Sequence, residues 1–383
     1  MSERVINFGV IGCGLMGREF ASAAARWNHL LKLDVRPRIV AACDTSPSVL
    51  SEFLGANTGV RGYANYHELL AQKDIEALYI AIPHNLHKEV YLAAVAAGKH
   101  FLGEKPFGID REANHRIMNA LAQRPDLVVR CSSEFPFFPG VQKIVALATS
   151  GSMGRILEVR CGLLHSSDMD PLKPLNWKRT IEFNGEYGCM GDLGMHAVHV
   201  PLRLGFVPRD VRAMLTKVVK HRPDGKGGTA PCETWDNALL ACSVGTSLDD
   251  EFPMLLEMKR IAPGHVNTWF LEIYGTSSSA RFSTRFPRTL EVLHYERGRP
   301  QAWLVQDLGY ESAYPAVTGG IFEFGFPDAI QQMWSAYCDE LAHGAKGMRQ
   351  PFTCATPRET EQSHALFDCA LKSARDGSVV RVA

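Results

Sequence analysis

Three glycines near the start of the chain have the spacing Gly-x-Gly-x-x-Gly, which is typical of a loop that binds a dinucleotide. An apolar run at 5–11 precedes them and an alanine-rich segment at 19–30 follows, so the sequence predicts a strand, a tight turn and a helix. Glycine permits the turn itself, a close approach to a pyrophosphate and tight packing of helix on strand. The phosphates would bind the N–H groups at the helix N-terminus. The candidate residues are Gly12, Gly14, Leu15, Met16 and Gly17.

An acidic residue stands at the end of the second apolar run. The run at 38–43 predicts a strand, and Asp44 directly follows it. A carboxylate at this position can accept hydrogen bonds from both hydroxyls of an adenosine ribose and would repel the 2′-phosphate of NADP. The sequence therefore predicts NAD as the cofactor. Thr45, a further candidate for cofactor binding, could tolerate a phosphate and leaves NADP open. The alternative for Asp44 is a turn or a helix cap, because Thr-Ser-Pro follows it.

The first third of the chain alternates between predicted strands and helices. Apolar runs at 77–82, 100–102 and 126–131 are separated by helix-like segments, which is the rhythm of a doubly wound parallel sheet. Ligands of such sheets bind beyond the carboxyl ends of the strands. Residues at two of these ends are therefore expected to face the cofactor. The candidates are Ile82, Pro83, Asn85, His87, Glu104 and Lys105.

These motifs resemble those of the Gfo/Idh/MocA oxidoreductase family. The resemblance rests on the glycine turn, on Ile-Pro-x-x-x-His at 82–87 and above all on Ala-Gly-Lys-His, which runs into Glu-Lys-Pro at 104–106. In that family the lysine of Glu-Lys-Pro reaches the nicotinamide and the substrate hydroxyl, which implies a catalytic role for Lys105. One residue departs from the pattern. His84 stands where the family more often has Asn or Thr, so Asn85 becomes the candidate for the ribose contacts there.

A second set of residues that could do chemistry lies in the glycine-rich segment 185–196. Asp192 and His196 are four residues apart, so they share a face if the segment is helical. A carboxylate beside an imidazole orients the ring and raises its basicity. The segment is similar to one in the same family, where the histidine contacts the substrate hydroxyl and the aspartate holds the substrate or the histidine. The resemblance implies that both residues are catalytic, whereas His199 is expected to serve helix packing.

Five further residues are weaker candidates for the site. Trp177 and Lys178 resemble a Trp-Arg pair of the family, which implies a cofactor contact for Trp177 and a substrate contact for Lys178. Surface packing is the alternative for both, and Lys178 could also receive an anionic substituent. Glu134 lies where the chain leaves the last strand of the predicted parallel sheet, so it could contact the substrate. His165 and Tyr187 are candidates for the same role, with packing at a sheet edge as the alternative.

The pattern of the chain changes after residue 131. Short strands separated by turns then dominate, which predicts an open, mostly antiparallel sheet. The expected α/β fold is therefore a Rossmann doubly wound parallel sheet in 1–131 and an α+β domain in 132–383 for substrate binding and oligomerisation. The final helix is a candidate to pack back on the first domain. In the family that the motifs resemble, the second sheet carries substrate on one face and subunit contacts on the other.

Composition excludes several classes of protein. The chain has 383 residues and a formal net charge of +0, without a basic run, which argues against nucleic acid or an anionic membrane as a partner. No apolar run reaches the roughly 18 residues of a transmembrane helix. The ten cysteines form no Cys-x-x-Cys pair or metal-type spacing, so no metal site is expected. Cys13 and Cys43 lie in predicted core strands and are expected to be small buried hydrophobic residues, and the protein is expected to be reduced and cytoplasmic.

The resemblance implies an NAD-dependent dehydrogenase. It would transfer a hydride to NAD from a secondary hydroxyl of a carbohydrate, namely a sugar, anhydro-sugar, glycoside or cyclitol, and would act as a homo-oligomer. The length and the Asn-Trp-Lys segment at 176–178 resemble the levoglucosan dehydrogenase and NAD-dependent glycosidase branch of the family. One alternative is a glycoside hydrolase that uses NAD for transient oxidation at C3, elimination, hydration and re-reduction. A keto-sugar isomerase or reductase and a non-catalytic NAD-binding sensor stay open as well.

Overall fold

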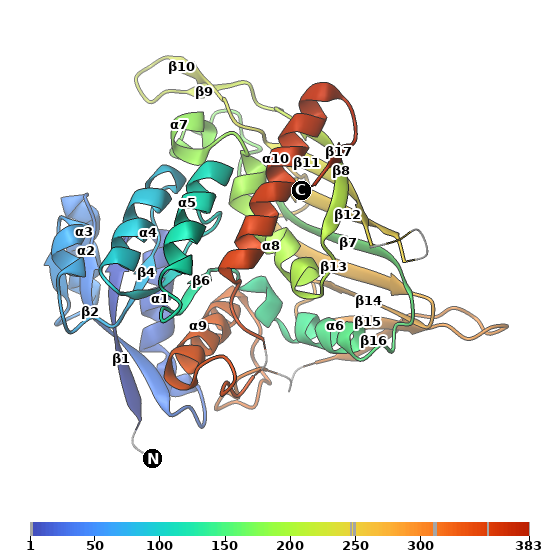
Figure 1. The fold of residues 1–383 in the computed structure, drawn as a ribbon, viewed down its shortest axis with the longest axis horizontal. Coiled ribbons are helices and arrows are strands. Elements are labelled where there is room, and N and C mark those ends of the chain that lie inside the picture. The colour runs from blue at the N-terminus through green and yellow to red at the C-terminus, as the bar shows by residue number, and fades with distance from the viewer. Residues whose placement is uncertain (1–2, 246, 248–249, 309–311, 351, 383) are drawn as a thin grey trace. The chain divides into compact units, whose positions relative to one another are not determined.

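The computed structural model describes residues 3–245, 247, 250–308, 312–350 and 352–382, and the chain divides into two compact units (Figure 1). The first unit comprises residues 1–108, 112–137 and 309–357. The second unit comprises residues 109–111, 138–308 and 358–383. This division differs from the expected single boundary after residue 131, because two later stretches of the chain belong to the first unit.

The first unit contains a parallel sheet of six strands in the order β3-β2-β1-β4-β5-β6. All five neighbouring pairs are parallel, which confirms the predicted doubly wound sheet. The three-residue strand β3 was not expected, because a stretch so short and exposed carries no periodic signal. The strands are β1 (Arg4–Ile11), β2 (Val35–Cys43), β3 (Arg61–Tyr63), β4 (Ala77–Ile80), β5 (His100–Gly103) and β6 (Val129–Cys131).

Helices connect these strands and pack on the sheet. The first of them begins at Leu15, inside the glycine motif, and ends at Ala25, so it starts and stops earlier than the predicted helix at 19–30. A short 3-10 turn at Trp27–His29 accounts for the remainder of that prediction. The helices of this unit are α1 (Leu15–Ala25), α2 (Pro47–Ala56), α3 (Tyr66–Leu70), α4 (His87–Ala96), α5 (Arg111–Ala122) and α9 (Phe326–His343).

Helix α9 joins the core of the first unit from more than 300 residues away in the sequence. Its Trp334 ring stacks on Phe20 of α1, with centroids 3.7 Å apart, and meets Phe8 of β1 edge-on at 5.6 Å. All three side chains are at most 1% exposed. The returning helix is thus α9, whereas the final helix, which was the expected candidate, belongs to the second unit.

The second unit contains a nine-stranded sheet in the order β16-β15-β14-β13-β7-β12-β11-β8-β17. Its pairs are antiparallel except for β12 with β7, which confirms the predicted mostly antiparallel sheet. The strands are β7 (Ile156–His165), β8 (Pro208–Thr216), β11 (Asn237–Val244), β12 (Phe252–Lys259), β13 (Asn267–Gly275), β14 (Ser278–Ser283), β15 (Thr289–His294), β16 (Leu304–Asp307) and β17 (Val380–Arg381). A separate hairpin is formed by β9 (His221–Pro223) and β10 (Thr229–Pro231).

The strand predicted over 211–221 ends earlier, at Thr216. The reason is a buried carboxylate: Asp236 accepts hydrogen bonds from the backbone N–H groups of Val218 at 2.7 Å and of Val219 at 3.1 Å. These bonds draw the backbone away from the ladder, and the chain then begins β9. A side chain that competes with ladder hydrogen bonds leaves no periodic trace in the sequence.

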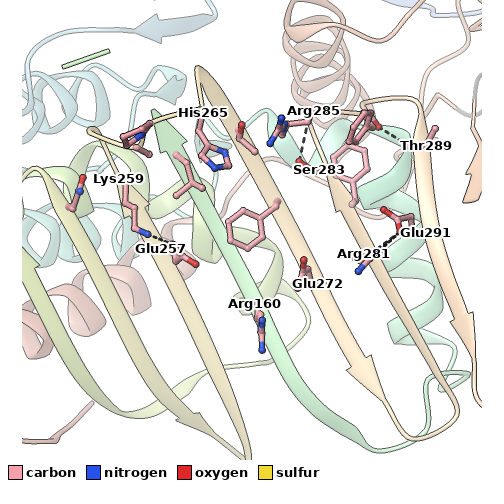
Figure 2. Close-up of a pocket in the computed structure, with 18 of the residues that line it drawn as sticks. Arg160, Glu257, Lys259, His265, Glu272, Arg281, Ser283, Arg285, Thr289 and Glu291 are labelled. Atoms are coloured by element: carbon pink, nitrogen blue, oxygen red, sulfur yellow. Dashed lines mark hydrogen bonds and ion pairs between the residues drawn. The ribbon is translucent and has the colours of Figure 1, made fainter. Parts of the chain in front are cut away.

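The two faces of the second sheet differ. Residues of β11 and β12 alternate between buried and accessible, and helix α8 (Cys189–Arg203) packs on the buried face (Figure 1). The opposite face carries a hollow of about 730 Å³ lined by charged and aromatic side chains (Figure 2). We call this opposite face the open face of the sheet. The remaining helices of the unit are α6 (Pro139–Thr149), α7 (Ile181–Asn184) and α10 (Pro357–Asp376).

All ten cysteines are buried and have free thiols, which confirms the burial expected for Cys13 and Cys43. In the ranges of the chain that the structure describes, no helix combines the length and the apolar character needed to cross a bilayer.

Replacement of the stacked indole tests the role of α9. Trp334→Ala should lower the free energy of unfolding of the first unit by about 3–5 kcal/mol, because it removes a large, fully buried side chain and leaves a cavity. Phe322→Ala is the control, since Phe322 lies in the same unit but is 83% exposed, and it should change stability by less than about 0.5 kcal/mol. Urea denaturation followed by tryptophan fluorescence and circular dichroism measures both. Equal effects of the two variants would contradict the packing of α9 in this core.

Candidate active site

The glycine loop joins β1 to α1 and has the shape that a pyrophosphate requires. Gly12 has a φ of 95°, and a Cβ atom there would lie 2.0 Å from the carbonyl oxygen of Ala81. A Cβ atom on Gly17 would lie 2.2 Å from the carbonyl oxygen of Gly12, so α1 packs this closely only on glycine. At Gly14, by contrast, a Cβ atom would meet no other part of the described chain within 4 Å. This open cradle fits phosphates at the start of α1, where the available N–H groups are those of Leu15, Met16 and Gly17.

Asp44 joins the end of β2 to the glycine loop. Its Oδ2 accepts a hydrogen bond of 2.9 Å from the backbone N–H of Cys13, and its Oδ1 accepts one of 2.8 Å from that of Ser46. Asp44 therefore forms the turn that was the alternative to its ribose role. Each carboxylate oxygen has two lone pairs, so these bonds leave room for ribose hydroxyls. The contacts of Asp44 and Thr45 with the cofactor stay predictions.

The segment after β4 passes Ile82 and Pro83 into a short turn. The side-chain Oδ1 of Asn85 in this turn is buried and lacks a hydrogen-bond partner among the described residues, which fits an acceptor for a ribose hydroxyl. His87 behaves differently: it is fully buried, with Nε2 3.1 Å from the Ile82 carbonyl oxygen and Nδ1 3.4 Å from the backbone nitrogen of Gly108. In this geometry His87 joins two loops, and its contact with the cofactor stays a prediction.

The residues after β5 include the candidate catalytic lysine. Glu104 is buried, and its Oε1 accepts a hydrogen bond of 2.7 Å from the hydroxyl of Tyr79. Its carbonyl oxygen accepts a second hydrogen bond, of 2.8 Å, from the hydroxyl of Tyr91. Glu104 therefore anchors the strand end to the core, and its contact with the cofactor stays a prediction. Lys105, the next residue, is half-buried and so remains accessible to ligands.

Glu134 lies at the neighbouring strand end. Gly103 of β5 pairs with Cys131 of β6, and the N–H of Ser132 donates a hydrogen bond of 2.9 Å to the carbonyl oxygen of Gly103. The register thus brings Glu134, three residues past β6, near the residues that follow β5. Glu134 is 4% exposed. Its contact with substrate stays a prediction.

The second set of candidate residues lies on α8, whose residues 189–202 are all buried. Asp192 and His196 are on one continuous helix, as the spacing predicted. The carbonyl oxygen of His196 accepts a hydrogen bond of 2.8 Å from the indole N–H of Trp269 on β13. A Cβ atom on Gly194 would lie 2.2 Å from the ring of Phe367 on α10, so glycine lets that ring approach the helix. Sheet and helix together fix the position of the two candidate side chains.

Two cations hold the carboxylate of Asp192. The Nζ of Lys178 lies 2.9 Å from Oδ1 and 3.2 Å from Oδ2, and Arg260 forms an ion pair with Oδ2. The Nε of Arg260 also bonds Asp168 at 2.8 Å. Burial acts to raise the pKa of Asp168, but the charge of Arg260 and a hydrogen bond from Lys173 hold that pKa well below its ordinary value. Asp192 is therefore one member of a larger buried ion network.

Arg179 extends this network and is itself 0% exposed. Its Nη1 lies 2.6 Å from Asp236, and its Nη2 lies 3.2 Å from Asp168. The sequence analysis missed Asp168, Asp236 and Arg260 as members of the site. Asp168 and Arg260 are 92 residues apart, so no local spacing could reveal their pairing. The one available signal was a charged residue directly after an apolar strand, as at the end of β12.

Tyr187 and His165, two of the weaker candidates, differ in how deeply they are buried. Tyr187 is 2% exposed, its hydroxyl lies 3.5 Å from the carbonyl oxygen of His364, and burial raises its pKa. These surroundings fit the alternative of packing, and the contact of Tyr187 with substrate stays a prediction. His165 is half-buried at the end of β7, beside Arg260 in the β7–β12 register, and its substrate contact stays a prediction.

Trp177 and His199 are the last two residues that the sequence singled out. Trp177 is half-buried in a 3-10 turn, with the Nζ of Lys178 5.5 Å from its ring centroid, and its contact with the cofactor stays a prediction. His199 is fully buried and accepts a hydrogen bond of 3.1 Å from the guanidinium of Arg203. Burial lowers the pKa of His199 to about 3, so its ring is neutral at physiological pH. The expected packing role of His199 agrees with this geometry.

Comparison with family models finds a known oxidoreductase domain in each of the two units. The family model described as "Oxidoreductase family, NAD-binding Rossmann fold" matches residues 6–131, and the Gfo/Idh/MocA C-terminal domain matches residues 141–283. Together the two matches cover well over half of the chain.

Curated relatives and solved structures include several dehydrogenases. Levoglucosan dehydrogenase from Pseudarthrobacter phenanthrenivorans is 27% identical over 298 residues, which is 73% of each chain. Glucose-6-phosphate 3-dehydrogenase from Bacillus subtilis is 26% identical over 57% of this chain and 60% of its own. A structure of levoglucosan dehydrogenase in complex with NADH and levoglucosan matches 99% of this chain and 100% of its own, with a TM-score of 0.87 at 22% identity. The chain belongs to the Gfo/Idh/MocA family of oxidoreductases, and its first unit is the NAD-binding Rossmann fold of that family.

Proposed function

We propose that this protein is an NAD-dependent dehydrogenase that oxidises a secondary hydroxyl of a sugar, anhydro-sugar, glycoside or cyclitol. The observation that carries the proposal is the state of Asp192, which is buried, paired with two cations and four residues from His196 on one helix. Lys105, at the strand end of the Rossmann unit, is the third residue that the family resemblance assigns to catalysis. Bound NAD supplies the hydride acceptor.

The side chains of the protein would accept the proton and orient the substrate. The substrate loses a hydride from carbon and a proton from its hydroxyl, so the protein must accept the proton. Lys105 and His196 are the two candidates for this general base. Asp192 acts as a positioning residue, because Lys178 and Arg260 keep its carboxylate in one place. Hydrogen bonds from these groups to hydroxyls would orient the substrate.

A neutral substrate suits the second unit better than an anionic one. Lys178 and Arg260 both pair with Asp192, and Arg179 pairs with Asp168 and Asp236. A phosphate or carboxylate on the substrate would compete with these carboxylates for cations that are already neutralised. We therefore propose neutral polyols as the substrate class. Hydroxyl groups can bond to paired ions without separating them.

The hydrolytic alternative requires a base near C2 of a glycoside. Tyr187, one candidate for this base, is 2% exposed, and burial raises its pKa, so its hydroxyl is unsuited to accept a proton from substrate. The candidates that remain are Glu134 and His165. One assay separates the two functions.

Purified protein with NAD should form NADH, one equivalent per ketone, with a member of a panel of levoglucosan, inositols, free sugars, sugar phosphates and aryl glycosides. His196→Gln should lower kcat by about 10²–10⁴ because a proton-transfer group is lost, while the Kd for NADH changes less than twofold. His294→Gln, at an exposed residue of β15 in the same unit, is the control and should leave kcat unchanged. Absorbance at the NADH band measures the reaction.

Release of aglycone that depends on catalytic NAD, without net NADH, would replace the dehydrogenase by the hydrolase. Tight NADH binding without turnover of any compound would favour the sensor. Faster oxidation of sugar phosphates than of neutral sugars would contradict the proposed substrate class.

A single charge change tests the preference for NAD. In Asp44→Asn the amide oxygen keeps one of the two hydrogen bonds, from Cys13 or from Ser46, the other bond is lost, and so is the charge that repels a 2′-phosphate. The ratio of the Kd for NADPH to that for NADH should fall by at least about tenfold, or roughly 1.4 kcal/mol. Fluorescence titration with both nucleotides measures the ratio. Glu52→Gln removes a charge from the neighbouring α2 and is the control, and an equal fall in both variants would contradict the ribose role of Asp44.

We also propose that a second copy of this chain covers the open face of the sheet. Cross-strand neighbours place Met214, Leu239, Glu257 and Phe270 in one row on this face, and Met214 is 65% exposed. Figure 2 shows the ion pairs Lys259–Glu257 and Arg281–Glu291 at the hollow of this face. Apolar side chains among alternating acids and bases form a surface that can match its own copy.

Charge placed on the open face should disrupt this assembly. Met214→Glu combined with Phe286→Glu, which changes a second exposed apolar residue at the hollow, should convert the oligomer to monomer at micromolar concentration. Sedimentation velocity measures the mass in solution. Phe322→Glu changes an equally exposed ring in the first unit and should leave the mass unchanged. A wild-type protein that sediments as a monomer would contradict this part of the proposal.

A further inference from the structure

The hairpin of β9 and β10 forms a small sheet of its own, and one of its arginines is buried. A hairpin of two strands is marginally stable by itself. Residues 224–228 at the tip are exposed, and the hairpin projects at the top of the view in Figure 1. Arg222 of β9 is only 1% exposed, so contacts of this side chain can anchor the hairpin in the second unit.

Arg222 binds the main chain of the loop at 168–175, which we call the Asp168 loop. Its Nη1 donates hydrogen bonds to the carbonyl oxygens of Asp170 at 2.6 Å and of Lys173 at 3.4 Å, and its Nη2 donates one to that of Asp168 at 2.5 Å. A main-chain hydrogen bond of 2.8 Å also joins the end of this loop to β9. A guanidinium carries five N–H donors in one rigid plane, so it can bind several carbonyl oxygens at once. The hairpin therefore holds the Asp168 loop at four points.

The Asp168 loop supplies a carboxylate to the ion network of the second unit. The Oδ2 of Asp168 lies 2.8 Å from the Nε of Arg260 and 3.2 Å from the Nη2 of Arg179. Arg260 in turn pairs with Asp192 on α8. Arg222 binds the carbonyl oxygen of the same residue whose carboxylate binds Arg260. The position of Arg222 therefore helps to set the position from which Asp168 holds Arg260.

The chain that leaves β10 holds a second cation of the network. The hydroxyl of Thr234, which is 1% exposed, donates a hydrogen bond of 2.9 Å to the carbonyl oxygen of Lys178. The N–H of Glu233 donates one of 2.8 Å to the carbonyl oxygen of Arg179. The Nζ of Lys178 pairs with Asp192. Contacts at both ends of one hairpin thus support the cations that pair with this carboxylate.

We propose that Arg222 is a positioning residue for Asp192, which it reaches through the Asp168 loop and Arg260. The inference rests on the proposed function for the role of Asp192 toward substrate. The three hydrogen bonds of the Arg222 guanidinium end on the main chain of the loop, so its effect on Asp192 passes through that loop. All of these contacts lie within the second unit.

Two replacements of Arg222 separate its anchoring from its charge. Arg222→Met keeps an apolar stem and removes every donor. Arg222→Lys keeps the charge but has one nitrogen in place of a planar fork, so it should hold the Asp168 loop less firmly. Lys226→Met removes a positive charge from the exposed tip of the same hairpin and is the matched control.

Hydrogen exchange of the full chain with bound NADH tests the contacts without substrate. In Arg222→Met, amides of the Asp168 loop and of residues 189–196 on α8 should exchange at least threefold faster than in the wild type, because the network loses a support. Amides of β14 and β15 should keep their rates. Arg222→Lys should give intermediate rates, and Lys226→Met should match the wild type. Peptide mass spectrometry measures all of them.

The pattern of exchange decides between a role in the network and other roles. Faster exchange confined to the Asp168 loop would show a local role for Arg222 and would overturn the inference. Faster exchange throughout the second unit, β14 and β15 included, would show a loss of stability without a specific path to Asp192 and would overturn it as well.

A double-mutant cycle tests the consequence for catalysis. With a substrate that the wild type oxidises, Arg222→Met should lower kcat/KM at least tenfold, while the Kd for NADH changes less than twofold. In an Asp192→Asn background the same replacement should lower kcat/KM less than threefold, because its path to substrate is already broken. A tenfold loss in both backgrounds would mean that Arg222 acts apart from Asp192, and the inference would be wrong. If no substrate is oxidised but the exchange results hold, the proposed function fails and the positioning of Asp192 by Arg222 stands.

Discussion

Burial of charged side chains is the constraint on which the second unit depends. Arg179 and Arg260 are both removed from water, and a buried guanidinium destabilises a protein unless carboxylates pair with it. Asp168 pairs with both arginines, and Asp192 binds Arg260 from α8. The members of this network come from a loop after β7, the end of β12, a 3-10 turn and α8. Because the pairs form only when these four elements meet, the network fixes α8, and with it the ring of His196.

In the first unit, hydrogen bonds to backbone groups hold the strand ends in place. Strand ends that face a ligand cannot be buried in a core, so other bonds must hold them in place. Asp44 links β2 to the N–H of Cys13 in the glycine loop, and His87 joins Ile82 to Gly108. Asp44 and His87, two candidates for cofactor contact, thus also hold the loops of the first unit in place. A loop fixed before binding loses less entropy when the ligand arrives.

The sequence predicted the two sheets because their signals are local. The alternation of apolar runs gave the parallel sheet, and a spacing of four gave the shared face of Asp192 and His196. It could not predict Trp334 in the core of the Rossmann unit or the bond between Arg260 and Asp192, since both depend on contacts between residues far apart in the chain. It also could not show that Tyr187 is buried, because a tyrosine near candidate catalytic residues looks the same in a sequence whether its hydroxyl is open or buried. Burial is a property of the packed fold, and one chain without its structure does not reveal it.

Charge compensation also bears on what the two units can do chemically. Oxidation of an alcohol turns one neutral group into another, and charge moves only with the proton and the hydride. Groups that receive a proton in a buried place need a neighbour that absorbs the added charge. His196 has the carboxylate of Asp192 one turn away, and Lys105 has Glu104 and Glu134 at adjacent strand ends. Lys178 and Arg260 already neutralise Asp192, so in the second unit the compensating charge belongs to the whole ion network. Under the proposed function, a neutral, hydroxyl-rich ring would leave these ion pairs intact, whereas a phosphate would compete for their cations.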